Sequence, residues 1–183
     1  MPSDFRTPPN IPVLLEVLHR HQVRFVVFGS GGAVAWGAKL TPGDLDVCPA
    51  LHEDNLRRLA AVLQEVGARP RLIPNWNTRE EVERWRPEPL TEAQLDHLFE
   101  TRFGDLDVVP RPNGPSGADD RFDFAALDAR ATTTSALGIP VRVAGLEDLV
   151  ASKMSRRRPK DIAALPELER VLALARAAAE SDA

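Results

Sequence analysis

The pattern of hydrophobic and polar positions changes along the chain between helical and strand-like spacing, and it predicts interspersed helices and strands. Val23–Phe28 is a β-branched and aromatic run that ends at a glycine turn, as expected of a buried strand. Apolar residues at helical spacing predict helices over Ile11–Arg20 and Glu53–Gly67. Further strands are predicted where short apolar runs lie between turn residues: Asp44–Cys48, Arg69–Ile73, Leu98–Phe103, Asp105–Val109 and Val141–Val143.

The remaining helices are predicted between these strands and at the C-terminal end: Ala33–Ala38, Asp123–Arg130, Leu146–Met154 and a last helix that Pro159 opens. Pro166 is expected to restart that last helix, so residues 166–179 form its distal half. Strands and helices without strict alternation favour an α/β or α+β fold, with a short mixed sheet flanked by helices and a helical C-terminal part. We expect a single domain over residues 1–183, with its core in about 11–165.

Composition narrows the class of protein. The chain has 183 residues, of which 43% are hydrophobic and 27% charged, as in ordinary soluble domains. Cys48 is the only cysteine, which excludes an internal disulfide and a four-cysteine zinc site. No apolar run reaches the ~18 residues of a membrane span, and the proline-rich N-terminus lacks a signal-peptide core, so we expect a cytoplasmic protein without a membrane partner. A net charge of −4 argues against a strong overall electrostatic attraction of nucleic acid to the protein, but it is compatible with a local basic patch that binds nucleic acid.

A repeated pentapeptide carries the most informative chemistry. Residues 43–47 and 104–108 both read Gly-Asp-Leu-Asp-Val. Because side chains alternate along a strand, Asp44 and Asp46 project to one side, about 7 Å apart, while the apolar residues enter the core. Neighbouring carboxylates repel one another, and a divalent cation removes that cost. Asp107 in the second copy would supply a third carboxylate, enough for Mg²⁺ or a two-metal site. The alternative is that these aspartates only end strands or cap turns.

The glycine turn at residues 29–32 follows a buried strand and precedes a helix, which is a common geometry for backbone amides that contact phosphate. It does not match the dinucleotide-binding fingerprint, because Val34 stands where the third glycine belongs, and it lacks the lysine of a P-loop. The glycine turn gains weight as a candidate phosphate site because Asp44 and Asp46 follow it on the next predicted strand.

Together, Phe28–Val34 with its Gly29-Ser30 step, Gly37, Asp44-Leu45-Asp46, Ser152-Lys153 and Arg158-Pro159-Lys160-Asp161 resemble the nucleotidyltransferase superfamily. Within it they are similar to small bacterial AbiEii-like and MenT-like proteins, which are often the toxins of toxin–antitoxin pairs. The resemblance extends from about Val23 to about Leu165. The sequence departs from this group in having Ser30 at the second glycine and Asp105 as an extra acid, and residues 74–95 match no motif.

The resemblance implies a set of residue roles. Asp44, Asp46 and Asp107 would bind Mg²⁺ or Mn²⁺, and Gly29 and Ser30 would contact the triphosphate. Lys153 would contact nucleotide phosphate, with Asp161 supporting it. From its helical position alone, Lys153 could equally be a surface residue. The basic residues that follow it form a possible RNA or phosphate patch, or a solvated face: Arg156, Arg157, Arg158 and Lys160.

These observations predict a metal-dependent enzyme that moves a nucleoside monophosphate from an NTP to an acceptor hydroxyl and releases pyrophosphate. The family implies an RNA acceptor such as a tRNA 3′ end, or a protein hydroxyl, and a possible cognate antitoxin. Two alternatives stay open. One is an antibiotic-modifying nucleotidyltransferase, for which an acidic pocket for a cationic substrate is expected. The other is a catalytically silent binding partner with the same fold.

Overall fold

The computed structural model describes the chain except for residues 1–7, 96, 117–119, 137 and 182–183. Its described strands form one mixed sheet in the order β3-β4-β5-β2-β1-β7-β6. The strands are β1 (Phe25–Phe28), β2 (Leu45–Pro49), β3 (Arg69–Pro70), β4 (His97–Thr101), β5 (Gly104–Val108), β6 (Thr132–Ala136) and β7 (Ile139–Val143). The helices are α1 (Ile11–Arg20), α2 (Gly29–Ala35), α3 (Glu53–Glu65), α4 (Arg79–Arg84), the 3₁₀ turn η1 (Glu92–Leu95), α5 (Phe124–Arg130), α6 (Leu146–Arg156) and α7 (Pro159–Ser181).

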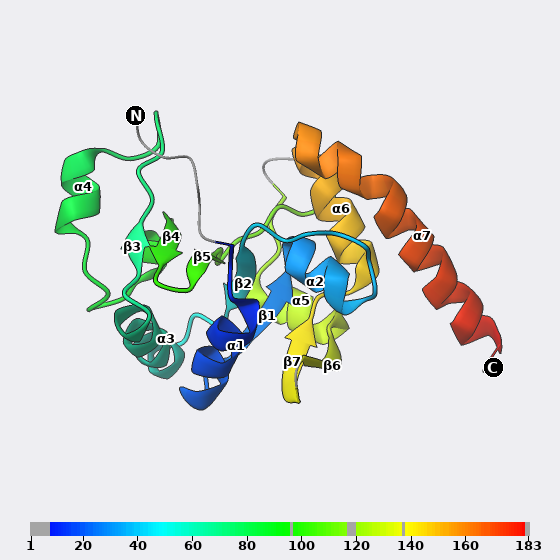
Figure 1. Cartoon of the computed structure of the whole chain (residues 1–183), viewed down its shortest axis with the longest axis horizontal. Coiled ribbons are helices and arrows are strands. Elements are labelled where there is room, and N and C mark those ends of the chain that lie inside the picture. Colours follow the sequence, from blue (N-terminus) through cyan, green and yellow to red (C-terminus); the bar gives the residue numbers. More distant parts are fainter. Residues whose placement is uncertain (1–7, 96, 117–119, 137, 182–183) are drawn as a thin grey trace.

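Strand β2 lies in the middle of the sheet, parallel to β5 on one side and antiparallel to β1 on the other. One face of the sheet packs on α1 and α3, through a core that includes Leu18, Leu63 and the β2 residues Leu45 and Val47. The opposite face carries Cys48 and packs on the helices that follow β5, and Figure 1 shows α6 and α7 lying side by side there. The predicted α/β fold with a short mixed sheet and a helical C-terminal part is confirmed.

Several element boundaries differ from those expected. Helix α2 begins at Gly29, not at Ala33, so the predicted glycine turn is the first turn of the helix. Strand β3 ends at Pro70 instead of reaching Ile73, and the segment after it contains the short helix α4. Helix α7 runs through Pro166 without a restart. Strand β6 was not predicted, because its Thr-rich sequence lacks an apolar face and it pairs only with β7.

None of the described helices has the length and apolar character needed to cross a membrane.

Candidate active site

The two copies of the repeated pentapeptide lie next to each other in the sheet. Strands β2 and β5 are parallel, and Asp46 pairs in register with Asp107. Their leucines, Leu45 and Leu106, are fully buried on the α1–α3 side. The aspartates therefore share the opposite side, as the alternation predicted.

Gly29 lets the carboxylate of Asp46 approach the start of α2. The residue has a positive φ of +63°, and a Cβ there would lie 2.0 Å from Asp46 Oδ2. Any side chain at this position would displace Asp46 and strain the backbone. The structure thus brings together two residues that the sequence analysis had singled out separately.

Asp107 is held by an arginine that the sequence analysis did not identify. Arg71 Nη2 donates to Asp107 Oδ1 at 3.0 Å and to Oδ2 at 3.3 Å, while Arg71 Nη1 donates to Asp105 Oδ2 at 2.6 Å. All three residues are buried. Asp105, the acid that departs from the family pattern, is thus the second carboxylate of a buried ion cluster.

Burial and mutual repulsion disturb the ionisation of the central carboxylates. Burial, together with the charges of Asp44 and Asp107, holds the pKa of Asp46 well above its usual value. Burial also raises the pKa of Asp107 to about 7, although the Arg71 charge opposes that shift. This is the electrostatic cost that a bound cation would relieve.

The donor set suits a hard divalent cation. Within the described part of the chain, Asp44 and Asp46 make no ion pair or hydrogen bond to another side chain, which leaves their oxygens accessible to a ligand. The same described residues contain no complete group of three His, Cys, Asp or Glu side chains arranged to hold a metal ion. Both Asp107 oxygens accept from Arg71, so this carboxylate has fewer free lone pairs for a metal ion than Asp44 and Asp46 have.

Helices α6 and α7 supply positive charge to the same site. Lys153 on α6 is buried, with its Nζ 3.5 Å from Ser30 Oγ and 3.6 Å from Asp161 Oδ1. Arg158 donates to both oxygens of Asp161, at 2.6 and 3.1 Å. Lys153 is therefore not a surface residue. Asp161 links it to Arg158 and fixes the position of both cations.

The ionisation of this cation cluster follows from the same contacts. Burial lowers the pKa of Lys153, although Asp161 and Asp46 oppose that shift. Burial alone would raise the pKa of Asp161, but the hydrogen bond and charge of Arg158, with the charge of Lys153, outweigh it and the net shift is downward. Asp161 is thus held as an anion beside two cations.

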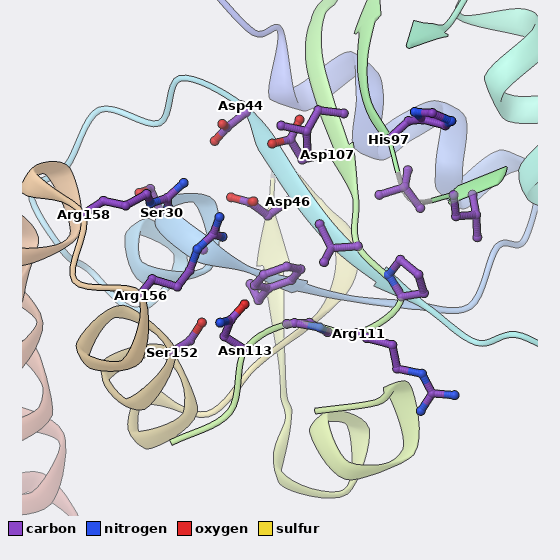
Figure 2. Close-up of a pocket in the computed structure, with 18 of the residues that line it drawn as sticks. Ser30, Asp44, Asp46, His97, Asp107, Arg111, Asn113, Ser152, Arg156 and Arg158 are labelled. Atoms are coloured by element: carbon purple, nitrogen blue, oxygen red, sulfur yellow. The ribbon is translucent and has the colours of Figure 1, made fainter. Parts of the chain in front are cut away.

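A cleft of about 1120 Å³ joins the carboxylates to these cations. Figure 2 shows Asp44, Asp46 and Asp107 near one another, with Arg156 and Arg158 across the cleft from them. Of the basic run, Arg156, Arg158 and Lys160 line the cleft, whereas Arg157 is not among its lining residues. Arg157 ends α6 in a left-handed conformation, with φ of 47°. The cleft lining thus includes the predicted residues Ser30, Asp44, Asp46, Asp107, Lys153 and Asp161.

Other lining residues were missed from the sequence. Arg71, Arg111 and Asn113 all line the cleft, but they stand in no motif and come from segments far apart in the chain. The one available signal for Arg71 was Asp105, because a second buried acid requires a cation.

The tryptophans divide into packing and cleft residues. Trp85 packs on Phe99 with ring centroids 5.0 Å apart, and Trp36 donates to the Ala144 carbonyl at 2.9 Å. Trp76 is 45% exposed and lines the cleft. Cys48 is buried, and that burial raises its pKa to about 12, so its thiol is inert.

Unsatisfied hydrogen-bonding capacity also concentrates in the cleft walls. Among the described residues, three buried side-chain atoms have no partner: Arg71 Nε, His97 Nδ1 and Ser155 Oγ. All three belong to residues that line this cleft. Because buried polar atoms are nearly always paired in stable cores, such a concentration is typical of a functional site.

The fold is similar to those of solved nucleotidyltransferases. The crystal structure of the lincosamide antibiotic adenylyltransferase LnuA bound to lincomycin superposes with a TM-score of 0.56 and 11% identity, covering 88% of this chain and 95% of that one. The crystal structure of ANT(2″)-Ia in complex with adenylyl-2″-tobramycin gives a TM-score of 0.53 and 16% identity, over 94% of this chain and 97% of the other. The solution structure of ANT(2″)-Ia gives a TM-score of 0.52 and 15% identity, over 93% of this chain and 91% of the other. No protein-family model matches the sequence, and no curated protein is similar to it. At these identities the likeness establishes a nucleotidyltransferase fold.

Proposed function

We propose that the protein transfers a nucleoside monophosphate from an NTP to an acceptor hydroxyl and releases pyrophosphate. The observation that carries this proposal is the meeting of Asp44, Asp46 and Asp107 with Ser30 and Lys153 in one cleft of a nucleotidyltransferase fold. Carboxylates that can hold a cation lie across from cations that can hold phosphates. That combination is the minimum needed to bind a metal–triphosphate complex.

In the proposed reaction, the basic residues on α6 and at the start of α7 interact with the triphosphate. Lys153, Arg156 and Arg158 line the cleft and would bind the triphosphate and stabilise the charge that develops on the departing pyrophosphate. Lys153 Nζ donates to Ser30 Oγ, and Asp161 orients Lys153 and Arg158. Because these side chains are fixed before substrate arrives, little reorganisation is needed in the reaction.

Mg²⁺ or Mn²⁺ held by Asp44 and Asp46 would neutralise phosphate charge and favour ionisation of the acceptor hydroxyl. Asp107 would complete the carboxylate set with the lone pairs that its hydrogen bonds to Arg71 leave free.

The geometry favours a small-molecule acceptor. The cleft volume of about 1120 Å³ is just above the ~300–1,000 Å³ typical of a single ligand site, which leaves room for a small acceptor beside an NTP. The ANT(2″)-Ia and LnuA structures contain modified tobramycin and lincomycin, respectively. An antibiotic-modifying reaction is therefore the chemistry that these neighbours support by analogy.

An RNA 3′ end or a protein hydroxyl is the second candidate acceptor, and a toxin role with a cognate antitoxin would follow from it. The observation in its favour is the basic run after Lys153, of which Arg156 and Lys160 line the cleft. A polynucleotide backbone could follow those charges into the site.

The proposal is tested by incubating the protein with each labelled NTP and Mg²⁺ or Mn²⁺, once with a panel of small hydroxyl compounds and once with total RNA. We expect one acceptor to gain a single nucleoside monophosphate. Calorimetry of NTP binding with and without the divalent cation checks the formation of the metal–NTP complex independently of the acceptor. If no NTP binds in the presence of either cation, the proposed nucleotidyl transfer is refuted.

Lys153 gives a second, sharper test. Removing one preorganised electrostatic donor typically costs about 10²–10³ in rate, so Lys153→Ala should lose transfer, and Lys153→Arg should recover part of it. Lys39→Ala is the matched control, because Lys39 lies outside the cleft lining. Transfer by Lys153→Ala at the wild-type rate would remove this residue from the site.

A further inference from the structure

The cleft has a second end, away from α6 and α7, that differs in chemistry from the phosphate-binding side. It is formed by the segment after β3, by η1 and β4, and by the segment from Pro110 to Asn113. Three residues that follow Arg71 line it: Leu72, Ile73 and Trp76. We refer to these three residues as the apolar wall.

Two of the three side chains of the apolar wall are exposed, although they are large and hydrophobic. Leu72 is 51% and Trp76 45% exposed. The described residues contain four other exposed large hydrophobic side chains, and none of those lines the cleft: Val34, Met154, Ile162 and Leu174. Clustered exposed apolar residues inside a concavity mark a binding site more specifically than scattered ones do.

The wall is also held in shape by its own hydrogen bonds. Asn77 accepts from the Ile73 amide at 2.8 Å and donates to the Arg71 carbonyl at 2.8 Å. The Trp76 amide donates to the Ile73 carbonyl at 3.1 Å. The segment therefore presents its apolar side chains to the cleft without collapsing over them, and a ligand would meet a preorganised surface.

The apolar wall starts at the residue after Arg71, and the Arg71 side chain contacts the carboxylate of Asp107. Arg71 reaches Asp107 with its guanidinium, and its main chain continues directly into Leu72. A molecule packed on Leu72 and Trp76 would thus have a substituent within reach of Asp107 and Asp46, where the NTP is expected to bind.

The charges at this end are mostly neutralised. Glu92 pairs with Arg111 at 2.9 Å, and Asp107 pairs with Arg71 at 3.0 Å. Among the described acids that line this end, Glu100 alone has no basic partner, while Arg121 adds a positive charge held by Asn113 at 2.7 Å. A polycation would find few unpaired carboxylates here.

We propose that the apolar wall binds the acceptor, and that the acceptor is a small molecule with an apolar or aromatic face that is neutral or singly charged, not a polycation. The inference rests on the proposed function, since it names the substrate class for the same cleft. Burial of the acceptor's apolar face on Leu72 and Trp76 orients its hydroxyl toward the carboxylates.

The test uses 1-anilinonaphthalene-8-sulfonate, an aromatic dye with one charge, titrated in Mg²⁺ buffer without nucleotide. The wild type should show saturable fluorescence. Leu72→Gln/Trp76→Ala should bind the dye at least about tenfold more weakly. Leu174→Gln is the matched control, because Leu174 is 59% exposed on α7, outside the cleft, and it should bind like the wild type. Circular dichroism and melting of all variants check folding.

Two further measurements separate the possible outcomes. Tobramycin should leave the dye bound, and displacement at comparable concentration would overturn the exclusion of polycations. A change of oligomeric state in the wall variant, seen by sedimentation, would make the wall an interface between copies and overturn the inference. Equal dye binding by the wall variant and the wild type would also overturn it.

Failure of the inference and failure of the proposed function give different results. Metal-dependent NTP binding in the wild type, together with transfer that Leu72→Gln/Trp76→Ala leaves intact, would refute the wall as the acceptor site but keep nucleotidyl transfer. Wall-dependent dye binding without any metal-dependent NTP binding would refute nucleotidyl transfer and, with it, the assignment of the wall to an acceptor.

Discussion

The two copies of Gly-Asp-Leu-Asp-Val have the same sequence, lie side by side in register, and nevertheless form two different environments. In the first copy, Asp44 and Asp46 make no side-chain ion pair within the described residues, and Asp46 lies against Gly29. In the second, Asp105 and Asp107 are buried and share Arg71.

The difference comes from what lies beside each strand. Strand β2 lies next to β1 and the glycine-rich start of α2, which leaves space for a ligand. Strand β5 lies next to β4, and the end of β3 brings Arg71 over its carboxylates. The pentapeptide fixes which side chains share a face, whereas tertiary neighbours decide whether a carboxylate serves a ligand or an internal ion pair.

The largest expected effect separates the two copies by function. Asp46→Asn should remove divalent-dependent NTP binding and reduce transfer on the order of 10³-fold, because it removes a charge that faces the metal–triphosphate. Asp105→Asn acts on Asp107 through Arg71 and through the loss of the repulsion between the two carboxylates, and should cost no more than about 10–100-fold. Calorimetry with Mg²⁺ and each NTP, alongside the transfer rate, measures both. Equal losses in the two variants would mean that the copies are functionally equivalent.

The second prediction concerns stability. Arg71→Leu leaves Asp107 buried without its cation and removes one cationic partner of Asp105, and breaking a buried pair costs about 3–5 kcal/mol. For a chain of this size, the melting temperature should fall on the order of 10 °C. Adding Asp105→Asn and Asp107→Asn to Arg71→Leu should recover part of that loss.

The matched control for Arg71 is Arg57→Ala on the surface of α3. Arg57 pairs with Glu53 and Asp54 at 2.9 Å, but its side chain is 65% exposed. Its removal should leave the melting temperature nearly unchanged, because solvent screens exposed pairs. A similar small change for Arg71→Leu would show that the buried cluster contributes no stability.

The third prediction compares the glycines that open the copies. Gly104 has φ of +95°, and a Cβ there would lie 2.5 Å from the Pro9 Cα, whereas a Cβ on Gly43 would meet nothing within 4 Å. Gly104→Ala should therefore cost about 2–4 kcal/mol from backbone strain and overpacking. Gly43→Ala should stay within about 0.5 kcal/mol of the wild type. Urea unfolding of the two variants measures the difference, and comparable midpoints would contradict it.

The sequence predicted those parts of the fold in which periodicity and packing agree. Helix α1 matches its predicted range of Ile11–Arg20, and β2 and β5 are shifted by only one residue. Helix α2 was placed too late because glycines have low helix propensity, and packing against β1, β2 and α6 overrides that preference.

The candidate site was predictable only where its residues stand in motifs. Asp44, Asp46, Asp107, Ser30 and Lys153 were identified, and the structure places them in one cleft. Arg71 was not, because its partners lie 34 and 36 residues away and local spacing does not encode such a contact. The apolar wall was likewise hidden, since only the fold shows that Trp76 lies in the cleft while Trp85 packs on Phe99. The roles of these residues in transfer remain predictions.

The smallest expected effect is on pH dependence in the absence of divalent cations. Asp46 and Asp107 have raised pKa values in the folded protein, so the folded state holds protons that the unfolded chain releases above about pH 4. Where the unfolded state binds fewer protons, the free energy of unfolding falls as pH rises. The contribution of these two carboxylates to stability should therefore decrease from about pH 4 through pH 7, where Asp107 titrates. Asp46→Asn removes one of the repelling charges, and should raise the melting temperature at pH 7.5 by about 2–4 °C for each ~1 kcal/mol of relief. The matched control is Asp54→Asn on the surface of α3, which should leave the melting temperature unchanged.

Mg²⁺ should raise the wild-type melting temperature and leave that of Asp46→Asn unchanged. A wild type more stable at pH 7.5 than at pH 5 without cations would show that carboxylate repulsion at β2 and β5 does not limit its stability.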